Sequence, residues 1–165
     1  MHDLTAMGQA VGALLKERKQ TIAVAESSAG GLISAALLAV PGASAYFVGG
    51  GVIYTLEARR TLLALADEDF AGVRPSSEPY ALRMARAVRD HVGTTWGLAE
   101  TGATGPTGNR YGDGAGHACI AIAGPVEHTL TIETRHSDRE ANMWTFTRAA
   151  LELLETRLKQ EGAGR

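Results

Sequence analysis

Residues 21–40 read TIAVAESSAGGLISAALLAV, and this stretch decides the fold class. Its first five residues are mostly apolar and partly β-branched, as in a buried strand, and the ESSAGG segment that follows is typical of a turn. The remaining residues are largely apolar over a length that suits a helix. That helix ends where Pro41 removes a backbone donor and Gly42 permits a turn. The order of strand, glycine turn and helix predicts an α/β protein.

The rest of the chain continues this alternation. A strand interrupted by three glycines is expected at 45–55, where a bulge or a close backbone approach would explain the glycines. Alternating runs on either side of a Gly-Pro pair predict an antiparallel hairpin at 117–134. Further helices are expected at 4–18, 57–65, 76–93 and 138–159, a strand at 95–100, and a frayed tail at 161–165. The buried stripe of the last helix is expected to comprise Trp144, Leu151, Leu154 and Leu158.

These elements predict a three-layer α/β/α fold with a mixed, mostly parallel sheet covered by helices on both faces. Length and composition favour a single domain over residues 1–165, with its core at about 5–158. Of the residues, 45% are hydrophobic and 21% charged, which is ordinary for a folded domain. The net charge is -2 and no basic stripe carries interleaved aromatic residues, so we expect no nucleic-acid partner.

The sequence does not show the patterns typical of secretion, membrane insertion or metal binding. Its first twenty residues place an acidic residue early and basic residues late, the reverse of a secretory signal, and no apolar run reaches the ~20 residues of a membrane-spanning helix. The single cysteine, Cys119, cannot form an internal disulfide and is expected to be a small buried residue. The five histidines show no paired ligand spacing. We therefore expect a cytoplasmic protein with no membrane contact and no metal site.

Three polar segments follow predicted strands, at residues 25–31, 54–59 and 101–108, and two of them are rich in glycine. Ligands of open α/β sheets bind beyond the carboxyl ends of the strands, where loops meet helix amino termini that have unpaired N–H groups. Ser27 lies between a strand and a helix, so its turn can hold an oxyanion, or the serine can simply cap the helix. No segment fits the G-x-G-x-x-G or P-loop spacing. The sequence thus predicts a small-molecule pocket of another kind.

Taken in order, these segments resemble the CinA carboxy-terminal domain family, the nicotinamide-nucleotide amidohydrolases. The family pattern reads approximately A-E-S-C-T-G-G, Y-x-N-x-x-K and S-G-x-A-G-P-x-G-G, followed by an aspartate–arginine pair that opens a last helix. The counterparts here are residues 25–31, 54–59, 101–109 and 138–139. The resemblance implies hydrolysis of the carboxamide of nicotinamide mononucleotide to nicotinate mononucleotide and ammonia, without a cofactor.

The resemblance also implies roles for individual residues. Ser27 would be the nucleophile, with the oxyanion held by backbone N–H groups of its turn, and Tyr54 and Arg59 would occupy the positions that handle protons. The nucleotide ligand would be bound by Glu26, Ser28, Gly30, Gly31, Thr101, Gly102, Thr104, Gly105, Pro106, Gly108 and Arg139. Members of the family associate, and the glycines at 49–51 permit close approach of a neighbour, so a homo-oligomer, most simply a dimer, is also expected.

One departure from the pattern bears directly on the chemistry. Arg59 stands where the family has lysine, and a guanidinium stays protonated at working pH, so Arg59 cannot act as a general base. The three lysines of the chain, Lys16, Lys19 and Lys159, lie in the predicted terminal helices, outside every motif. Two functions therefore remain open: an amidohydrolase of this family, and a ligand-binding module that has kept the pocket and lost turnover.

Overall fold

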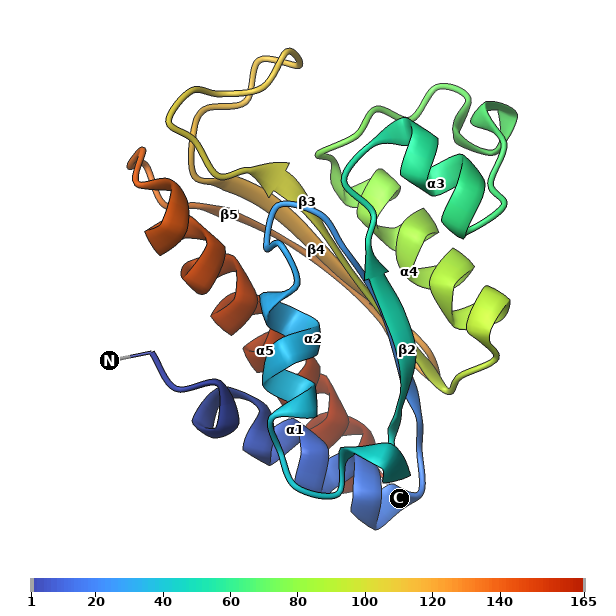
Figure 1. Ribbon diagram of the computed structural model, residues 1–165. Helices are drawn as coiled ribbons and strands as arrows, with labels where there is room; N and C mark the ends of the chain where they lie inside the picture. The colour runs from blue at the N-terminus through green and yellow to red at the C-terminus, as the bar shows by residue number, and fades with distance from the viewer. Residues whose placement is uncertain (1, 165) are drawn as a thin grey trace.

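The computed structural model describes residues 2–164 as one five-stranded sheet with helices on both faces (Figure 1). The strands are β1 (Ile22–Glu26), β2 (Phe47–Val52), β3 (Trp96–Ala103), β4 (His117–Ala123) and β5 (Glu127–Glu133). The helices are α1 (Leu4–Arg18), α2 (Leu32–Leu38), α3 (Leu56–Leu62), α4 (Glu78–Val92) and α5 (Arg139–Ala163), with short 3-10 turns η1 (Ala43–Ala45) and η2 (Asp67–Phe70). None of the described helices is both long and apolar enough to cross a membrane.

The strand order in the sheet is β2-β1-β3-β4-β5. β1 pairs in parallel with β2 and β3, whereas β4 pairs antiparallel with β3 and β5. Four of the five strands therefore point the same way and β4 points back, which confirms the predicted mixed, mostly parallel sheet. As a result, the carboxyl ends of β1, β2 and β3 meet at the same end of the sheet.

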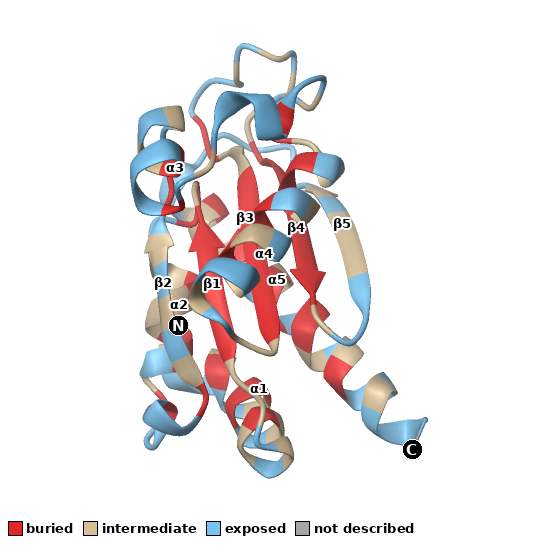
Figure 2. Cartoon of the chain, turned by 90° about the vertical axis from the view of Figure 1, so that its right-hand side faces the viewer, coloured by how far each residue is buried: buried red, intermediate tan, exposed pale blue. Residues whose placement is uncertain are grey.

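Different side chains cover the two faces of the sheet. α1, α2 and α5 lie over one face, and the central strands present large side chains to them: Val24, Leu98, Ile120 and Ile122. α4 lies over the other face, where the buried strand residues are small, Cys119 and five alanines: Ala23, Ala25, Ala99, Ala121 and Ala123. The inner strands are buried, while the edge strands β2 and β5 are partly exposed (Figure 2). The predicted layers of helix, sheet and helix are thus confirmed.

Glycine allows two close backbone contacts in these layers. A Cβ atom at Gly97 would lie 1.9 Å from the carbonyl oxygen of Ala85 in α4, so α4 rests directly on β3. A Cβ atom at Gly50 would lie 2.4 Å from the carbonyl oxygen of Val24, so β2 and β1 are also in close contact there. The predicted bulge is also present, because the β1–β2 register skips Val48. The close approach expected for this glycine strand is therefore made by β1.

Three local expectations were wrong. β3 continues to Ala103, because β4 pairs with it that far. α5 continues to Ala163, so most of the expected frayed tail is helical. Trp144 is only partly buried and stacks on the ring of His2, with ring centroids 4.1 Å apart, so it lies against the amino-terminal segment instead of the sheet. Phe146 is the aromatic residue that α5 buries in the core.

Candidate functional site

A cavity of about 500 Å³ lies beyond the carboxyl ends of β1 and β3. Its size is within the range of small-molecule pockets, and its position is where open α/β sheets bind ligands. Four of the residues predicted from the sequence line it, namely Ser27, Tyr54, Thr101 and Gly102. The structure therefore brings the three predicted segments together around one space.

Ser27 is the first residue after β1 and is half-buried in the cavity wall. Its hydroxyl makes no hydrogen bond within residues 2–164, so the oxygen is available to a ligand. Its backbone N–H donates to Oε2 of Glu100 at 3.0 Å. A serine in this place can attack a bound electrophile once a neighbouring group accepts its proton.

Glu26 serves the helix that follows the turn. Its carboxylate is fully buried and accepts the N–H groups of Gly31 at 2.7 Å, Ile33 at 3.1 Å and Ser34 at 2.9 Å. The preceding Gly30 and Gly31 have φ angles of 70° and 101°, which glycine adopts without strain. The structure thus places Glu26 as a cap on α2, where its oxygens face backbone N–H groups instead of the cavity.

Glu100 is a cavity residue that the sequence did not predict. It is 2% exposed, and its carboxylate accepts the N–H of Ala29 at 2.8 Å, the N–H of Ser27, and the hydroxyl of Ser28. Burial raises the pKa of Glu100 to about 7, although the three hydrogen bonds favour the charged form. The available signal was an acidic residue inside the otherwise apolar strand sequence WGLAE, directly before the glycine-rich loop.

The turn after β1 therefore has few N–H groups left for an oxyanion. Those of Ser27 and Ala29 are bound to Glu100, and that of Gly31 is bound to Glu26. Within residues 2–164 the backbone N–H of Ser28 has no acceptor. The predicted oxyanion hole is thus reduced to this donor as long as the two carboxylates keep their contacts.

Tyr54 and Arg139 join three of the predicted segments at the cavity rim. Tyr54 is 60% exposed, and its hydroxyl accepts a hydrogen bond from Nη2 of Arg139 at 3.2 Å. Nη1 of the same arginine donates to the carbonyl oxygen of Gly105 at 2.5 Å. Because Arg139 has no carboxylate partner within the described residues, its positive charge is available to an anionic ligand.

Arg59 lies elsewhere. The residue is 3% exposed, and its guanidinium binds Oδ1 of Asp67 at 2.9 Å and the hydroxyl of Tyr80 at 3.3 Å. It also stacks on Phe70, with Cζ 4.1 Å from the ring centroid. Arg59 is not part of the cavity wall, whereas its partner Tyr80 is. The structure therefore does not bring Arg59 to Ser27, and gives it a packing role between α3, η2 and α4.

The other predicted ligand residues shape the loop between β3 and β4. Thr104 is buried, and its carbonyl oxygen accepts the side-chain amide of Asn142 at 2.8 Å. Pro106 and Gly108 are exposed and do not line the cavity. At the start of the loop, a Cβ atom at Gly102 would lie 2.3 Å from a carbonyl oxygen of β4, so its smallness serves strand pairing.

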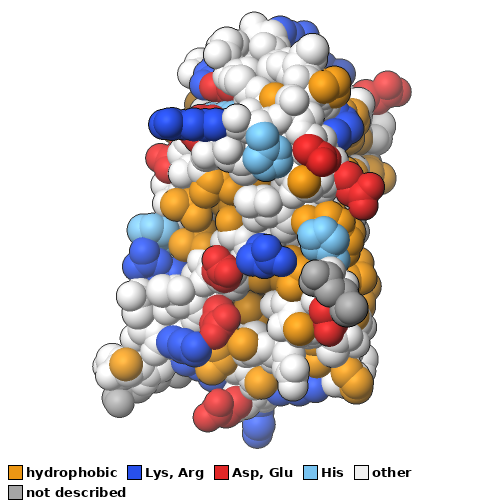
Figure 3. Space-filling view, turned by 90° about the vertical axis from the view of Figure 1, so that its left-hand side faces the viewer, with side chains coloured by type: hydrophobic (Ala, Val, Ile, Leu, Met, Phe, Trp, Pro, Cys, Tyr) orange, Lys and Arg blue, Asp and Glu red, His pale blue; other side chains and the backbone are white. Residues whose placement is uncertain are grey.

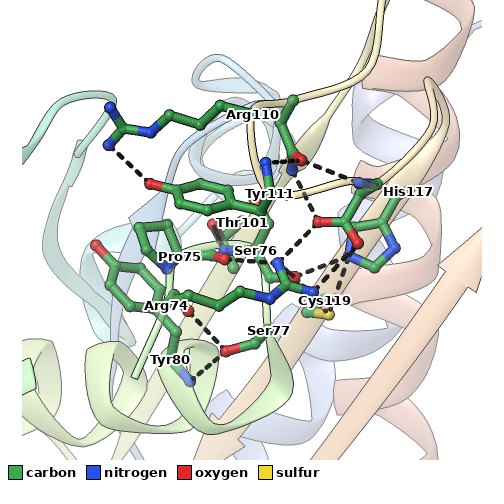
Figure 4. Close-up of polar contacts among 12 residues, drawn as sticks. Arg74, Pro75, Ser76, Ser77, Tyr80, Thr101, Arg110, Tyr111, His117 and Cys119 are labelled. Carbon is green, nitrogen blue, oxygen red and sulfur yellow. Dashed lines mark hydrogen bonds and ion pairs between the residues drawn. The ribbon is translucent and has the colours of Figure 1, made fainter. Parts of the chain in front are cut away.

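Hydrogen bonds around Asp113 and His117 fix the far part of this loop (Figure 4). Arg74 binds both carboxylate oxygens of Asp113, at 2.8 and 3.2 Å. His117 contacts Glu133 at 2.5 Å through Nδ1 and the carbonyl oxygen of Ser76 at 2.8 Å through Nε2. Burial alone would lower the pKa of His117, but these hydrogen bonds outweigh it and raise the pKa. The loop that carries Arg110 and Tyr111 is thus held over the cavity.

Cys119 lies in β4 and is 2% exposed, as expected for a small buried residue. Its Sγ atom is 3.6 Å from Nε2 of His117, and burial raises the pKa of the thiol, so the thiolate is disfavoured.

Among residues 2–164, no group of three histidine, cysteine, aspartate or glutamate side chains is placed to hold a metal ion. The face formed by α5 and the amino-terminal segment mixes acidic, basic and apolar side chains without a continuous basic stripe (Figure 3).

Comparisons with known proteins agree with this geometry. A family model described as the CinA C-terminal domain matches residues 4–158. A CinA-like protein of Gloeobacter violaceus is 38% identical over 155 residues, and one of Desulforapulum autotrophicum is 38% identical over 157 residues. These alignments cover 92% and 94% of the chain but 36% and 37% of the relatives, so the chain spans about a third of their length.

Solved structures show the same fold. A competence-damaged protein (CinA) superfamily protein of Klebsiella pneumoniae superposes with a TM-score of 0.88 and 26% identity, covering 96% of this chain and 99% of that one. The competence/damage inducible protein CihA of Agrobacterium tumefaciens superposes with a TM-score of 0.82 and 27% identity, covering 96% and 97%. From its motifs, its fold and these matches, the chain belongs to the CinA C-terminal domain family.

Proposed function

We propose that this chain hydrolyses the carboxamide of nicotinamide mononucleotide, with Ser27 as the nucleophile. The observation that carries the proposal is the Ser27 hydroxyl, which lies unbonded in the wall of a cavity of about 500 Å³. The substrate itself is taken from the resemblance of the four sequence segments to the amidohydrolases of the family. The expected cytoplasmic location and the expected pairing with a second copy stay predictions.

The lining of the cavity supports a ligand of this kind. The side chains of Tyr54, Tyr80 and Tyr111 supply flat apolar surfaces and hydroxyl groups, which suit a heteroaromatic ring and a ribose. Arg110 lines the cavity and Arg139 lies at its rim, and neither forms an ion pair with a carboxylate within residues 2–164. Two such guanidinium groups favour the phosphate of a mononucleotide.

In the proposed reaction, Oγ of Ser27 attacks the carboxamide carbon and ammonia leaves. Water then hydrolyses the ester that joins the acyl group to Ser27. The N–H of Ser28 would face the developing oxyanion, because it is the unengaged donor of this turn in the described chain. One donor of this type is typically worth about 10²–10³ in rate, so the proposed site has less oxyanion stabilisation than a two-donor site.

A second function, binding without turnover, is favoured by the position of the basic side chains. Arg59 is engaged with Asp67, Lys16 donates to a carbonyl oxygen between α2 and η1, and Lys159 pairs with Glu155. No lysine side chain lines the cavity. If no other group accepts the proton of Ser27, the protein would bind the nucleotide and release no ammonia.

Ammonia release and binding, measured on the same preparation, test the proposal. The parent protein is expected to form nicotinate mononucleotide and ammonia, and Ser27→Ala is expected to bind nicotinamide mononucleotide with similar affinity by calorimetry while forming neither product. The matched control is Ser44→Ala, which alters an exposed serine in η1 and should turn over as the parent does. Equal rates for Ser27→Ala and the parent would refute the role of Ser27. Binding without ammonia release by the parent would establish the second function.

A further inference from the structure

The turn after β1 holds a buried carboxyl group that the reaction, as outlined, does not use. Glu100 lines the cavity together with Ser27, and Oε2 of Glu100 is 3.0 Å from the Ser27 backbone nitrogen. Its second oxygen, Oε1, accepts the Ser28 hydroxyl. The carboxylate therefore contacts the backbone of the proposed nucleophile, and it accepts a hydrogen bond from the hydroxyl of the next residue, Ser28.

The charged groups around Glu100 leave it able to exchange a proton. β1 contributes Glu26, whose negative charge raises the pKa of Glu100, and α2 has no titratable side chain. α5 contributes Arg139, whose contacts are Tyr54 and Gly105, and β4 contributes His117, whose contacts are Ser76 and Glu133. No cation in the described chain neutralises Glu100, so its charge is not fixed by an ion pair.

A comparison with Glu26 shows why only one of these two buried carboxylates is suited to chemistry. Glu26 is surrounded by donors of the α2 backbone and by the Ser34 hydroxyl, and it does not line the cavity. Glu100 has three donors, all from the turn that contains Ser27, and it does line the cavity. A base must lie within reach of the proton it accepts, and the contact is often made only in the complex.

We propose that Glu100 is the general base of this site and accepts the proton of the Ser27 hydroxyl, in place of the lysine whose position Arg59 occupies. This inference rests on the proposed function. As Oγ of Ser27 bonds to the carboxamide carbon, its proton passes to Glu100. The C–N bond then breaks, and Glu100 returns the proton to the nitrogen, which leaves as ammonia.

The second half of the reaction uses the same carboxylate. Water gives one proton to Glu100 as its oxygen bonds to the acyl carbon, and the ester bond to Ser27 breaks. The proton then passes to Oγ of Ser27, which restores the hydroxyl and releases the carboxylic acid. Atoms balance with one amide and one water consumed and one acid and one ammonia formed. A base whose pKa lies near neutral pH is well matched to this task, and burial raises the pKa of Glu100 to about 7.

A serine-directed reagent tests Glu100 separately from nicotinamide mononucleotide turnover. Phenylmethanesulfonyl fluoride transfers its sulfonyl group to an activated serine oxygen as fluoride leaves and the base takes the proton. The rate at which Ser27 is sulfonylated, followed by peptide mass spectrometry from pH 5 to pH 9, should rise through an inflection near 7 in the parent. Glu100→Gln should react about 10²–10⁴-fold more slowly and lose the inflection.

Three further variants separate catalysis from folding. Glu100→Asp should restore part of the rate and keep an inflection. Ser28→Ala removes a hydrogen bond that lowers the pKa of Glu100, so its inflection should shift to higher pH; a merely structural Glu100 would not produce this shift. Glu57→Gln, which changes an exposed carboxyl in α3 close to the cavity, should match the parent.

The outcomes distinguish the two proposals. A folded Glu100→Gln that keeps the parent's rate and inflection, an unshifted inflection in Ser28→Ala, or a parent whose Ser27 is not labelled at any pH would each overturn the role of Glu100. Labelling that depends on Glu100, with no ammonia released from nicotinamide mononucleotide, would refute the proposed substrate and leave the base assignment standing. Ammonia release that needs Ser27 but not Glu100 would do the reverse.

Discussion

Replacing Glu100 with glutamine, as Glu100→Gln, changes the charge of a buried group and almost nothing of its shape. The amide oxygen can accept the N–H groups of Ser27 and Ala29, as Oε2 of the carboxylate does. The amide NH₂ can donate to Oγ of Ser28, whose hydroxyl then turns to serve as the acceptor. All three hydrogen bonds of the carboxylate can therefore be replaced, and the variant is expected to fold.

The size of the effect follows from the shift in pKa. The pKa of Glu100 is raised from 4.5 to about 7 in the folded protein, so the folded protein holds this proton more tightly than the unfolded chain does. Below pH 4.5 both states are protonated, and between 4.5 and 7 the folded state alone keeps the proton, so the free energy of unfolding falls as the pH rises. From pH 5 to pH 8 the loss is about 2–3 kcal/mol for a group that titrates in this way.

Urea unfolding of the parent and Glu100→Gln at pH 5, 6, 7 and 8 measures this difference. The contributions of all other groups cancel between the two proteins. The stability of Glu100→Gln relative to the parent should therefore increase by about 2–3 kcal/mol between pH 5 and pH 8. Glu57→Gln, an exposed control, should run parallel to the parent. If Glu100→Gln also runs parallel to the parent, Glu100 does not titrate in this range and the reasoning about its burial is wrong.

Arg59→Lys should lower the free energy of unfolding by roughly 1–3 kcal/mol and should not speed ammonia release, because lysine cannot both bind Asp67 and stack on Phe70; a stable, faster variant would contradict this. The raised pKa of His117 means that its stabilising contacts are complete below pH 6.5 and are lost as the pH rises through the raised value. After correction for the intrinsic pH dependence of amide hydrogen exchange, exchange in the loop between β3 and β4 should therefore accelerate above neutral pH. Constant protection to pH 9 would contradict this role of His117. Light scattering should show a dimer of the parent and a 17.3 kDa species for Val48→Glu, because Val48 is 55% exposed on the edge strand β2; a parent of 17.3 kDa would rule out the dimer.

Much of the fold could be predicted from the sequence because strands, helices and turns have local signals. The segment TIAVAESSAGG predicted the strand and turn that position Ser27, and the structure confirms both. The end of β3 at Ala103 was missed because Gly102 has weak strand preference, and strand pairing with β4 decides where β3 ends. Trp144 was misplaced because helical spacing predicts which face of the helix a residue lies on, but not which other elements cover that face at each position along the helix.

The candidate site was harder to predict, because its contacts join residues far apart in the chain. Sequence order placed Ser27, Tyr54 and Thr101 near one another, since Ser27 follows β1, Tyr54 follows β2 and Thr101 lies in the last part of β3, and these strands end at the same end of the sheet. The Arg59 side chain points away from the cavity because it forms an ion pair with Asp67. The hydrogen bonds between Glu100 and the turn after β1 join residues more than seventy positions apart. No local pattern reveals either contact.

The alanine-covered face of the sheet has a consequence for ligand size. α4 contributes Tyr80 and Met84 to the cavity wall, and the sheet contributes Ala25, so the depth of the cavity is the spacing between this helix and these strands. Contact between the Gly97 position and α4 fixes one point of that spacing. Ala99 is buried beneath α4 but does not line the cavity. A branched side chain at this position would increase the distance between α4 and the sheet. Selectivity for larger or smaller ligands can thus be altered from a position that no ligand touches.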